Sequence, residues 1–398
     1  MPKELIPVSE AKQLIEEHIE ASSPIQFHLN EAAGLILAEE LFSLSDLPPF
    51  NQSSMDGYAL NFEEWQKHQE LLIDGESQAG LADLKPLKPQ SARRIFTGAA
   101  VPPGADTVVM QEKTSIYNGK LSITDPQLVK GQNVRLQGSE AKANEMALEK
   151  NSYLSPAAIG FIAGLGINQI LAYPQPSVSI ILTGNELQTP GKPLQLGQVY
   201  DANSYALKAA LNQIGITKIN ILSSEDDLEI LSSVLKSALN QSDLVLLTGG
   251  VSVGDYDFVV QATKENEVEQ IFHKIKQKPG KPLFFGKKGK KYIFGLPGNP
   301  ASVLNCFYEY VYPAIGILNN SKKDLIKIQA PLSKSQKKAA GLTQFLKGYY
   351  DGKMAHDLKA QESFRLSSFA KANCLIKLDE NQTEFTEGQI VEIHLLPV

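Results

Sequence analysis

Residues 243–258 have the sequence DLVLLTGGVSVGDYDF, which predicts a buried strand followed by a glycine-rich loop. The apolar run ends at Gly249 and Gly250, and Ser252 follows two residues later. Glycines let the backbone approach a ligand closely and present N–H groups to an anion. The loop has neither the Gly-Lys-Ser/Thr of a Walker loop nor the GxGxxG spacing. We therefore interpret these three residues as candidate substrate-binding positions, with an ordinary glycine turn as the alternative.

Strand-like and helix-like segments alternate on both sides of this loop. Strand candidates occupy residues 177–182, 218–224, 243–250 and 292–296, and helix candidates occupy residues 203–214, 226–240, 258–267 and 301–315. This alternation favours a mainly parallel sheet with helices on both faces. Ligand sites of such sheets lie at the carboxyl ends of the strands.

The sequence on either side of this part does not show the same regular alternation of strands and helices. Helical patterns occur near the N-terminus and again after Ser155, and the segment between them combines short strand-like runs with Pro, Gly, Asn and Asp. The tail returns to strand-like runs. The expected domains are a discontinuous helical domain (1–45 and 147–175), an inserted β-rich domain (46–146), an α/β domain (176–323) and a C-terminal β domain (324–398).

The composition excludes several classes of protein. The formal net charge is -6, whereas nucleic-acid-binding proteins usually carry a basic excess. No apolar stretch approaches the roughly 18 residues of a membrane span, and the N-terminus lacks the apolar core of a secretory signal. Cys306 and Cys374 are expected to be buried, reduced thiols. We therefore expect a cytoplasmic protein that binds neither nucleic acid nor membranes.

Acidic side chains follow two of the expected strands. Asp255 and Asp257 lie in the glycine loop, and Glu186 lies just beyond the strand at residues 177–182. Carboxylate oxygens bind Mg²⁺ beside phosphates, so Asp255 and Asp257 could hold this ion, and Glu186 lies at the ligand edge expected for such a sheet. The two positions kept as candidate metal ligands are Glu186 and Asp257. The alternatives are aspartates near a helix start and a loop glutamate that faces solvent.

Four lysines lie within residues 274–281. Lys274, Lys276 and Lys278 would share one side of an extended segment, and Lys281 follows a Pro-Gly turn. A convergent group of this kind suits a phosphate or another oxyanion. A solvated lysine face is the alternative.

Three further turns carry candidate residues. Pro297 follows a strand, and Asn299 can cap a helix that begins at Pro300. Asp56, in an Asp-Gly turn, could bind a metal or orient a substrate, and Thr97 could offer its hydroxyl and amide to an anion. A plain turn aspartate and tight turn packing are the alternatives. The sequence suggests neither a nucleophile–base pair nor a zinc site, so it favours phosphate and divalent-ion chemistry.

In their order along the chain, these motifs resemble those of the molybdopterin molybdenumtransferase family, which includes the C-terminal enzyme portion of gephyrin. The resemblance covers essentially the whole chain, and the ordered set is far more specific than any single motif. The matching segments are SMDGYA (54–59), RIFTGAAVPPGADTVVMQE (94–112), NVRLQGSE (133–140), TGNEL (183–187), YDANSYAL (200–207), GGVSVGDYDF (249–258), KPGKP (278–282) and GLPGNPAS (295–302).

The resemblance implies a multidomain α/β plus β fold in which a molybdopterin-binding α/β domain accompanies the helical part, the inserted β-rich part and a C-terminal β barrel. It implies a homodimer that inserts molybdate into adenylated molybdopterin and releases AMP and the molybdenum cofactor, with Mg²⁺ present. It also implies two kinds of protein partner, namely the molybdopterin adenylyltransferase and the proteins that mature apo-molybdoenzymes.

The resemblance assigns roles to individual positions. Those expected to be catalytic are Asp56, Thr97, Glu186, Asp257, Lys274 and Lys278. Those expected to bind substrate are Arg135, Gly249, Gly250, Ser252, Asp226, Lys281, Pro297, Pro300 and Arg365. Within these sets, Lys278, Lys281 and Arg365 match the residues that hold molybdate, whereas Asp56, Thr97 and Arg135 match residues of the β-rich part that face the substrate cleft.

Two positions depart from the family pattern, and two other functions stay open. Asn185 and Glu140 stand where relatives often have Asp, and neither is assigned a catalytic role. A molybdopterin adenylyltransferase would share the α/β fold, but the long additions on both sides of that domain argue against it. A scaffold with a vestigial site is the other alternative, and the retained acidic and basic residues argue against it.

Overall fold

The computed structural model describes residues 5–80, 84–251 and 258–397, so Ser252 and Asp257 lie outside the described residues. The chain divides into two compact units. The first comprises Met1–Ile25, Gly34–Ile36 and Ala172–Val398, and the second comprises Gln26–Ala33 and Leu37–Leu171. The four-domain division expected from the sequence is finer than this one and stays a prediction.

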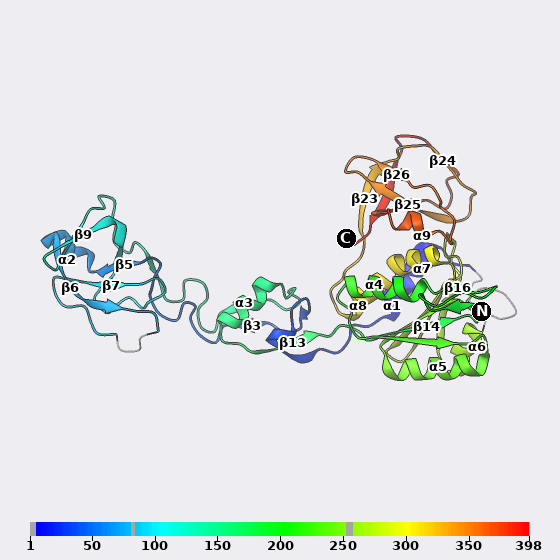
Figure 1. The fold of residues 1–398 in the computed structure, drawn as a ribbon, viewed down its shortest axis with the longest axis horizontal. Coiled ribbons are helices and arrows are strands. Elements are labelled where there is room, and N and C mark those ends of the chain that lie inside the picture. The colour runs from blue at the N-terminus through cyan, green and yellow to red at the C-terminus, as the bar shows by residue number, and fades with distance from the viewer. Residues whose placement is uncertain (1–4, 81–83, 252–257, 398) are drawn as a thin grey trace. The chain divides into compact units, whose positions relative to one another are not determined.

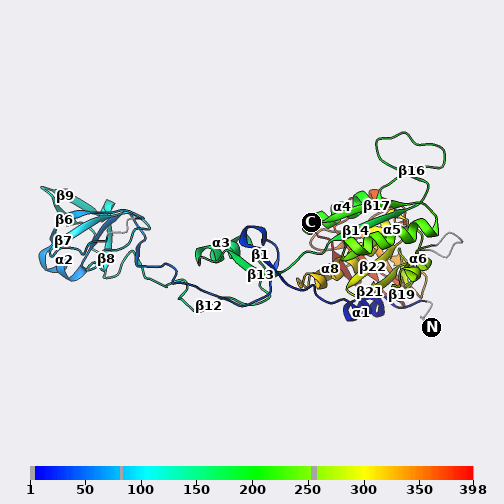
Figure 2. The same cartoon turned by 90° about the horizontal axis from the view of Figure 1, so that it is seen from below.

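A six-stranded sheet forms the centre of the first unit, in the order β17-β14-β18-β22-β21-β19. Figure 1 labels β14 of this sheet, and Figure 2 also labels β17, β22, β21 and β19. Its parallel strands are β17 (Ile219–Ser224), β14 (Val178–Thr183), β18 (Leu244–Thr248) and β22 (Lys291–Leu296). These correspond to the four predicted strands, and the α/β prediction is confirmed. The sequence did not predict the antiparallel edge, which consists of β21 (Phe284–Lys288) and β19 (Glu269–His273).

Both faces of this sheet are covered, because successive side chains of a strand point to opposite faces. On one face, Ile180 and Leu182 of β14 pack into a core shared with α1 (Val8–His18) and α4 (Asn203–Gln213). On the other face, Ile181 packs into a core shared with α5 (Leu228–Gln241) and α6 (Val259–Glu265). The strand ends are therefore the natural place for a ligand.

Helix α5 begins where a polar side chain accepts one of its first N–H groups. Asp227 caps α5, and its carboxylate accepts a hydrogen bond from the backbone N–H of Ile230 at 2.9 Å. Along α5, Leu231, Leu235 and Leu239 recur at four-residue spacing and are all buried. This confirms the helix predicted at residues 226–240.

The helix predicted at residues 301–315 consists of three consecutive segments. They are α7 (Pro300–Cys306), the π-helical segment η3 (Phe307–Val311) and α8 (Tyr312–Leu318). π-helical turns are rare and often occur at functional sites. This one contains Glu309 and Tyr310, which are both fully buried.

A second sheet of the first unit is built mostly from the C-terminal residues. Its strands are β20 (Gln277–Lys278), β25 (Thr343–Tyr350), β27 (Cys374–Leu378), β29 (Ile390–Leu395) and β23 (Ile326–Pro331), and β26 (Ala355–Asp357) pairs with β25. The short β20 comes from the lysine-rich segment and pairs in parallel with the start of β25. The lysine-rich segment is thereby joined to the C-terminal β domain.

The second unit contains its own six-stranded sheet, in the order β8-β5-β7-β6-β10-β9. The strands are β5 (Gly57–Leu60), β6 (Glu70–Ser77), β7 (Ser91–Ile95), β8 (Thr107–Met110), β9 (Thr114–Tyr117) and β10 (Lys120–Ile123). All four residues of β5 are buried, and neighbouring residues of this strand enter different cores. The same unit contains α3 (Pro156–Gly164), which Ser155 caps as its sequence suggests.

Two simpler observations complete the fold. No helix in the described ranges is long and apolar enough to cross a membrane. Cys306 and Cys374 are both buried free thiols, and burial raises the pKa of Cys374 to about 12. Both cysteines therefore stay protonated at neutral pH.

Candidate functional site

The turns that follow β14, β18 and β22 meet at one edge of the central sheet. Leu182 pairs with Thr248 and Thr248 pairs with Leu296, so the three strands end together. The hydroxyl of Thr183 donates to the carbonyl of Thr248 at 3.1 Å, and the N–H of Gly249 donates to Leu296 at 3.2 Å. The glycine loop, the TGNEL turn and the GLPGNP turn are thereby adjacent.

Both glycines of the loop are required by space and by backbone conformation. Gly249 has a φ of 88°, and a Cβ there would lie 2.8 Å from the hydroxyl oxygen of Thr183. Gly250 has a φ of 63°, and its Cβ would lie 3.2 Å from a methyl group of Val259. A larger residue would therefore push these loops apart. The N–H of Gly249 extends the strand ladder and is not available to a ligand.

The acidic candidates of this unit lie at the same edge. Glu186 is exposed, and its carboxylate lies over Gly184, where a Cβ would be 2.5 Å from the Glu186 oxygen. Asn185 and Asp226 are hydrogen-bonded to each other, each through its backbone N–H to the other's side-chain oxygen, at 3.4 and 3.3 Å. Asp257, the second predicted metal ligand, lies outside the described residues.

The described residues contain only part of the predicted metal site. Within the described ranges, no three His, Cys, Asp or Glu side chains are grouped closely enough to hold a metal ion. The carboxylate of Glu186 forms no ion pair with any described residue. Its carboxylate oxygens are donors of the type that Mg²⁺ prefers.

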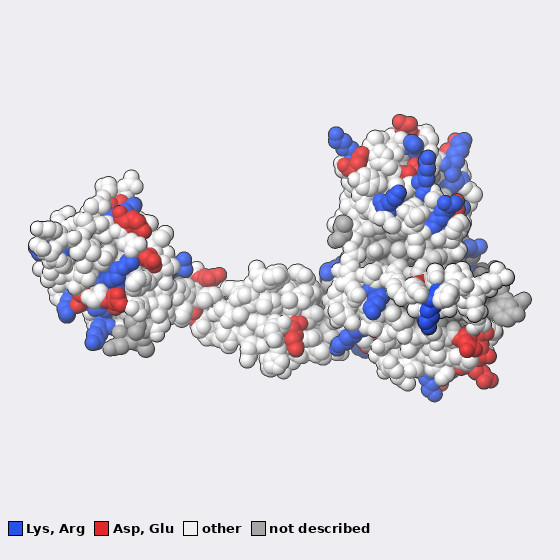
Figure 3. Space-filling model, in the orientation of Figure 1, with Lys and Arg blue, Asp and Glu red and all other residues white. Residues whose placement is uncertain are grey.

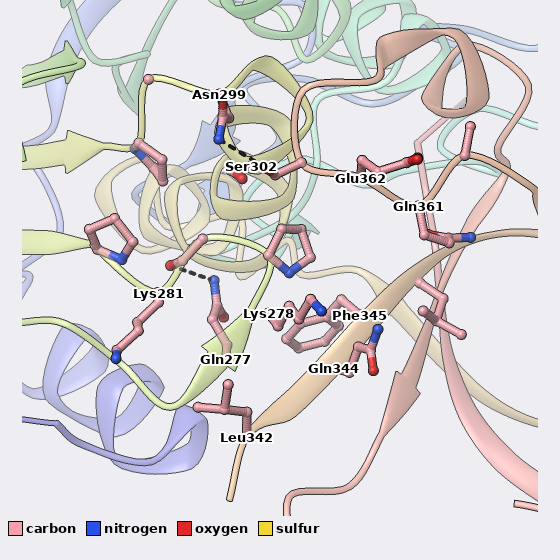
Figure 4. Close-up of a pocket in the computed structure, with 18 residues that line it drawn as sticks. Gln277, Lys278, Lys281, Asn299, Ser302, Leu342, Gln344, Phe345, Gln361 and Glu362 are labelled. Atoms are coloured by element: carbon pink, nitrogen blue, oxygen red, sulfur yellow. Dashed lines mark hydrogen bonds between the residues drawn. The ribbon is translucent and has the colours of Figure 1, made fainter. Parts of the chain in front are cut away.

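A cavity of about 790 Å³ lies between the α/β part and the C-terminal β domain of the same unit (Figure 4). It brings together Lys278 and Lys281 from the lysine-rich segment with Pro297 from the GLPGNP turn. Residues 360–363 of the C-terminal domain complete the wall. Lys278 and Lys281 are exposed, and neither forms an ion pair within the described part of the chain. The charged residues that line the cavity are therefore these two lysines and Glu362, whose carboxylate pairs with Arg365.

Three further candidates of the first unit, namely Lys274, Pro300 and Arg365, do not line this cavity. Lys274 has a φ of 76°, and its backbone N–H donates a hydrogen bond to the carbonyl of Leu283. Pro300 begins α7 one residue beyond the lining residue Asn299. Arg365 pairs with Glu362, whose oxygen lies 3.2 Å from the guanidinium Nε.

Ser363 joins the two walls of the cavity, and sequence reasoning missed it. Its hydroxyl accepts a hydrogen bond from the side chain of Asn299 at 2.9 Å, and its carbonyl accepts one from the N–H of Ala301 at 3.0 Å. These bonds connect the start of α7 to the C-terminal domain. No local pattern indicates this role, because the partners are more than 60 residues apart.

Lys347 is a second residue that the sequence did not reveal. It is only 3% exposed, and its ammonium donates to the carbonyls of Ala360, Glu362 and Arg365 at 2.7, 3.2 and 3.0 Å. Burial lowers the pKa of this lysine. Lys347 therefore holds the loop that forms the C-terminal wall. Other lysines and arginines lie scattered, among acidic and uncharged residues, on the face of the domain that Figure 3 shows.

In the second unit, Asp56 and Thr97 form a hydrogen-bonded pair. One carboxylate oxygen of Asp56 accepts the backbone N–H of Thr97 at 2.7 Å and its hydroxyl at 2.8 Å. These two bonds, the backbone one first, hold the pKa of Asp56 below its ordinary value, and the charge of Arg94 adds to the effect. The structure thus brings these two candidates together.

Two arginines lie near this pair. Arg94, which was not predicted, donates to the carbonyl of Gly57 at 2.8 Å, and its guanidinium lies 4.8 Å from the ring centre of Phe96. Arg135 is exposed on β11 (Val134–Arg135), opposite Gln52. Strand pairing places Arg94 opposite Tyr58 of β5 and Arg135 opposite Gln52.

Comparison with known proteins identifies the family. The MoeA N-terminal region (domain I and II) matches residues 6–166, a probable molybdopterin binding domain matches residues 179–316, and the MoeA C-terminal region (domain IV) matches residues 329–396. The molybdopterin molybdenumtransferase of Haemophilus influenzae is 37% identical over 381 residues, covering 93% of this chain and 94% of that protein. A Staphylococcus epidermidis protein of the same name is 33% identical and covers 98% of this chain and 95% of its own length.

A solved structure gives the same assignment. The molybdopterin biosynthesis MoeA protein from Pyrococcus horikosii superposes with a TM-score of 0.82 at 29% identity, over 98% of this chain and 99% of that one. The likeness extends through the N-terminal, α/β and C-terminal parts together. The chain therefore belongs to the MoeA family of molybdopterin molybdenumtransferases.

Proposed function

We propose that this enzyme inserts molybdate into adenylated molybdopterin and releases AMP and the molybdenum cofactor. The cavity bearing Lys278 and Lys281 is the single observation that carries the proposal. It is large enough for a small oxyanion and the end of an organic substrate. Its lining contains two lysines that form no ion pair with a described residue, and one carboxylate, that of Glu362, which pairs with Arg365. Such a cavity suits a doubly negative tetraoxo anion.

The lysines and the neutral polar groups of the cavity would have different roles. Lys278 and Lys281 would attract and hold molybdate through charge-assisted hydrogen bonds. Ser302 and Asn299 lie in the same wall and could contact the organic substrate. Holding two reactants in a fixed arrangement supplies much of the rate increase in transfers of this kind.

The edge of the central sheet would hold the adenylate end of the substrate. Mg²⁺ is proposed there, with Glu186 and Asp257 as ligands, because this ion takes one or two carboxylates and completes its shell with waters and phosphate oxygens. When bound, it would withdraw charge from the phosphate that leaves with AMP. Glu186 would orient the ion, and the neighbouring Asp226 would keep the TGNEL turn in place through Asn185.

Further parts of the proposal concern the setting of the reaction. A homodimer is the proposed assembly, and the proposed protein partners are the adenylyltransferase that supplies the substrate and the proteins that mature apo-molybdoenzymes. A cytoplasmic location belongs to the same proposal. Asp56, Thr97 and Arg135 are proposed to act on the substrate as their family matches imply.

The test measures AMP release by the full-length chain incubated with adenylated molybdopterin, Mg²⁺ and varied molybdate. We expect AMP release to depend on molybdate. We expect Lys278→Ala to raise the half-saturating molybdate concentration by roughly 10- to 100-fold, as for the loss of one charged hydrogen bond. Lys337→Ala is the matched control, because its side chain is 80% exposed and pairs with a surface glutamate.

Other outcomes would favour another function. Adenylation of molybdopterin from ATP, without molybdate-dependent AMP release, would support an adenylyltransferase. The absence of both reactions in the folded protein would support a scaffold. An unchanged molybdate requirement in Lys278→Ala would remove this lysine from the oxyanion site.

A further inference from the structure

A buried amide lies directly beneath the turn that carries Lys278 and Lys281. Gln277 is fully buried, and its Nε2 donates to the carbonyl of Gly280 at 3.1 Å (Figure 4). Its Oε1 accepts a hydrogen bond from the hydroxyl of Tyr310 at 2.5 Å. Because donor and acceptor are both engaged, the amide is fixed in a single orientation.

The backbone of the turn packs closely on this amide and on the helical segment behind it. Gly280 has a φ of 89°, and a Cβ there would lie 2.5 Å from the sulfur of Cys306 and 2.8 Å from Nε2 of Gln277. The side chain of Asn305 donates to the carbonyl of Pro279 at 3.4 Å. Two consecutive carbonyls of the turn are therefore held from below by buried side chains.

The lysine side chains have no comparable support of their own. Within the described ranges, neither Lys278 nor Lys281 forms an ion pair, and both are exposed. Their positions therefore depend on the backbone of the turn between them. Tyr310 belongs to η3, so the π-helical segment helps to determine where the hydroxyl meets Gln277.

We propose that Gln277 is a positioning residue for the oxyanion substrate, acting through the Pro279–Gly280 turn to hold Lys278 and Lys281 in place. Tyr310 fixes the orientation of Gln277 and thereby contributes to the same positioning of the two lysines. Burial raises the pKa of Tyr310, so its hydroxyl stays protonated and remains a donor at all working pH values. The inference rests on the proposed function, because it assumes that the two lysines bind molybdate.

The test uses two substitutions of similar shape in the full-length enzyme. Gln277→Met removes the donor and the acceptor, and Tyr310→Phe removes only the hydroxyl. We expect each to raise the half-saturating molybdate concentration by about three- to tenfold, as for one lost hydrogen bond, while kcat at saturating molybdate changes little. Thermal unfolding is measured on the same samples.

Asn266→Leu is the matched control. Asn266 is another buried amide of the same unit, and its side chain donates to the carbonyls of Ser232 and Ala262 at 3.0 and 2.9 Å. Its loss should lower the unfolding temperature and leave the molybdate requirement unchanged. This control separates a local effect on the turn from a general loss of stability.

The outcomes distinguish this inference from the proposed function. If Lys278→Ala raises the molybdate requirement but Gln277→Met and Tyr310→Phe do not, the positioning role is wrong and the function stands. A rise in Asn266→Leu equal to that in Gln277→Met would also overturn the positioning role. If the unmodified enzyme releases no AMP in response to molybdate, the proposed function itself fails. Should Gln277→Met not fold, Tyr310→Phe decides the matter.

Discussion

Asp56 receives both of its carboxylate hydrogen bonds from one residue, Thr97. The backbone N–H is the larger cause of the lowered pKa, and the hydroxyl is the second. Thr97→Val keeps the backbone donor and removes the hydroxyl at nearly constant volume. We expect the pKa of Asp56 to rise toward its ordinary value of 3.8 without reaching it. Carboxyl carbon chemical shifts, followed by NMR between pH 2 and 6, measure this change.

Asp46 provides an internal control for that titration. Its pKa is also lowered, mainly by the backbone N–H of Ala143 and then by the side chain of Gln137. Thr97→Val touches none of these groups, so the titration of Asp46 should not move. Equal shifts of both aspartates would show that the substitution disturbs the whole unit and that the bond to Thr97 does not account for the effect.

Individual residues could be assigned from sequence only where their chemistry is local. Asp56 sits in an Asp-Gly turn and Asn299 precedes a helix-starting proline, and both features are visible in a few consecutive letters. Asn299 occupies the N-cap position of α7, but its side chain makes no capping hydrogen bond, so that part of the prediction is wrong. Ser363 and Lys347 act through bonds to loops that the sequence places elsewhere. In the sequence, Lys347 looks like any other strand lysine, because the three carbonyls that it contacts lie in a loop that reaches it only in the folded chain.

Among the elements, η3 places a carboxylate in the interior of the first unit. Glu309 is fully buried, its oxygens lie 2.6 Å from the ammonium of Lys12 and 2.6 Å from Nδ1 of His394, and these partners come from α1 and β29. Glu309→Gln would leave the cation of Lys12 without its counter-charge. Because breaking a buried pair in this way costs about 3–5 kcal/mol, we expect a loss of that size in chemical denaturation.

The dependence of this contribution on pH follows from its charges. Burial alone would raise the pKa of Glu309, but the charge of Lys12 and the hydrogen bond to His394 outweigh it and lower the pKa from 4.5 to about 2. A carboxyl whose pKa is lower in the folded state stabilises the fold above its unfolded pKa. The contribution is therefore complete above about pH 4.5 and is lost as the pH falls toward 2.

Glu384→Gln is the matched control for Glu309→Gln. Glu384 pairs with Lys337 at 2.8 Å, but its side chain is 69% exposed, and such surface pairs contribute roughly 0–1 kcal/mol. We expect only Glu309→Gln to flatten the acid limb of the stability curve. A similar curve for both variants would mean that the buried network does not stabilise the charged form of Glu309.

The helices and strands differ in how well they could be predicted from their sequences. The parallel strands and α5 follow simple apolar patterns, so β14, β18 and α5 were predictable. The two-residue strand β20 was not, because only its pairing with β25, more than 60 positions away, makes it a strand. The π-helical register of η3 was also hidden, since its residues continue an ordinary helical pattern.

At the scale of the whole molecule, three of the described hydrophobic cores each lie within a single unit. The cores built around Ile180 and Leu235 lie in the first unit, and the core built around Leu60 lies in the second. Units with separate cores commonly unfold in separate steps, so a single two-state transition is not expected.

Calorimetry on three forms of the chain tests this independence. Leu60→Ala and Leu235→Ala each remove a fully buried leucine, at a cost of about 2–5 kcal/mol to the unit that contains it. We expect Leu60→Ala to lower one unfolding transition and Leu235→Ala to lower the other, each leaving its companion in place. A single transition that both variants lower equally would contradict this independence, because a cavity in one core would then destabilise the whole chain. Separate transitions would further mean that Lys278 and Asp56 each keep their local geometry when the other unit is destabilised.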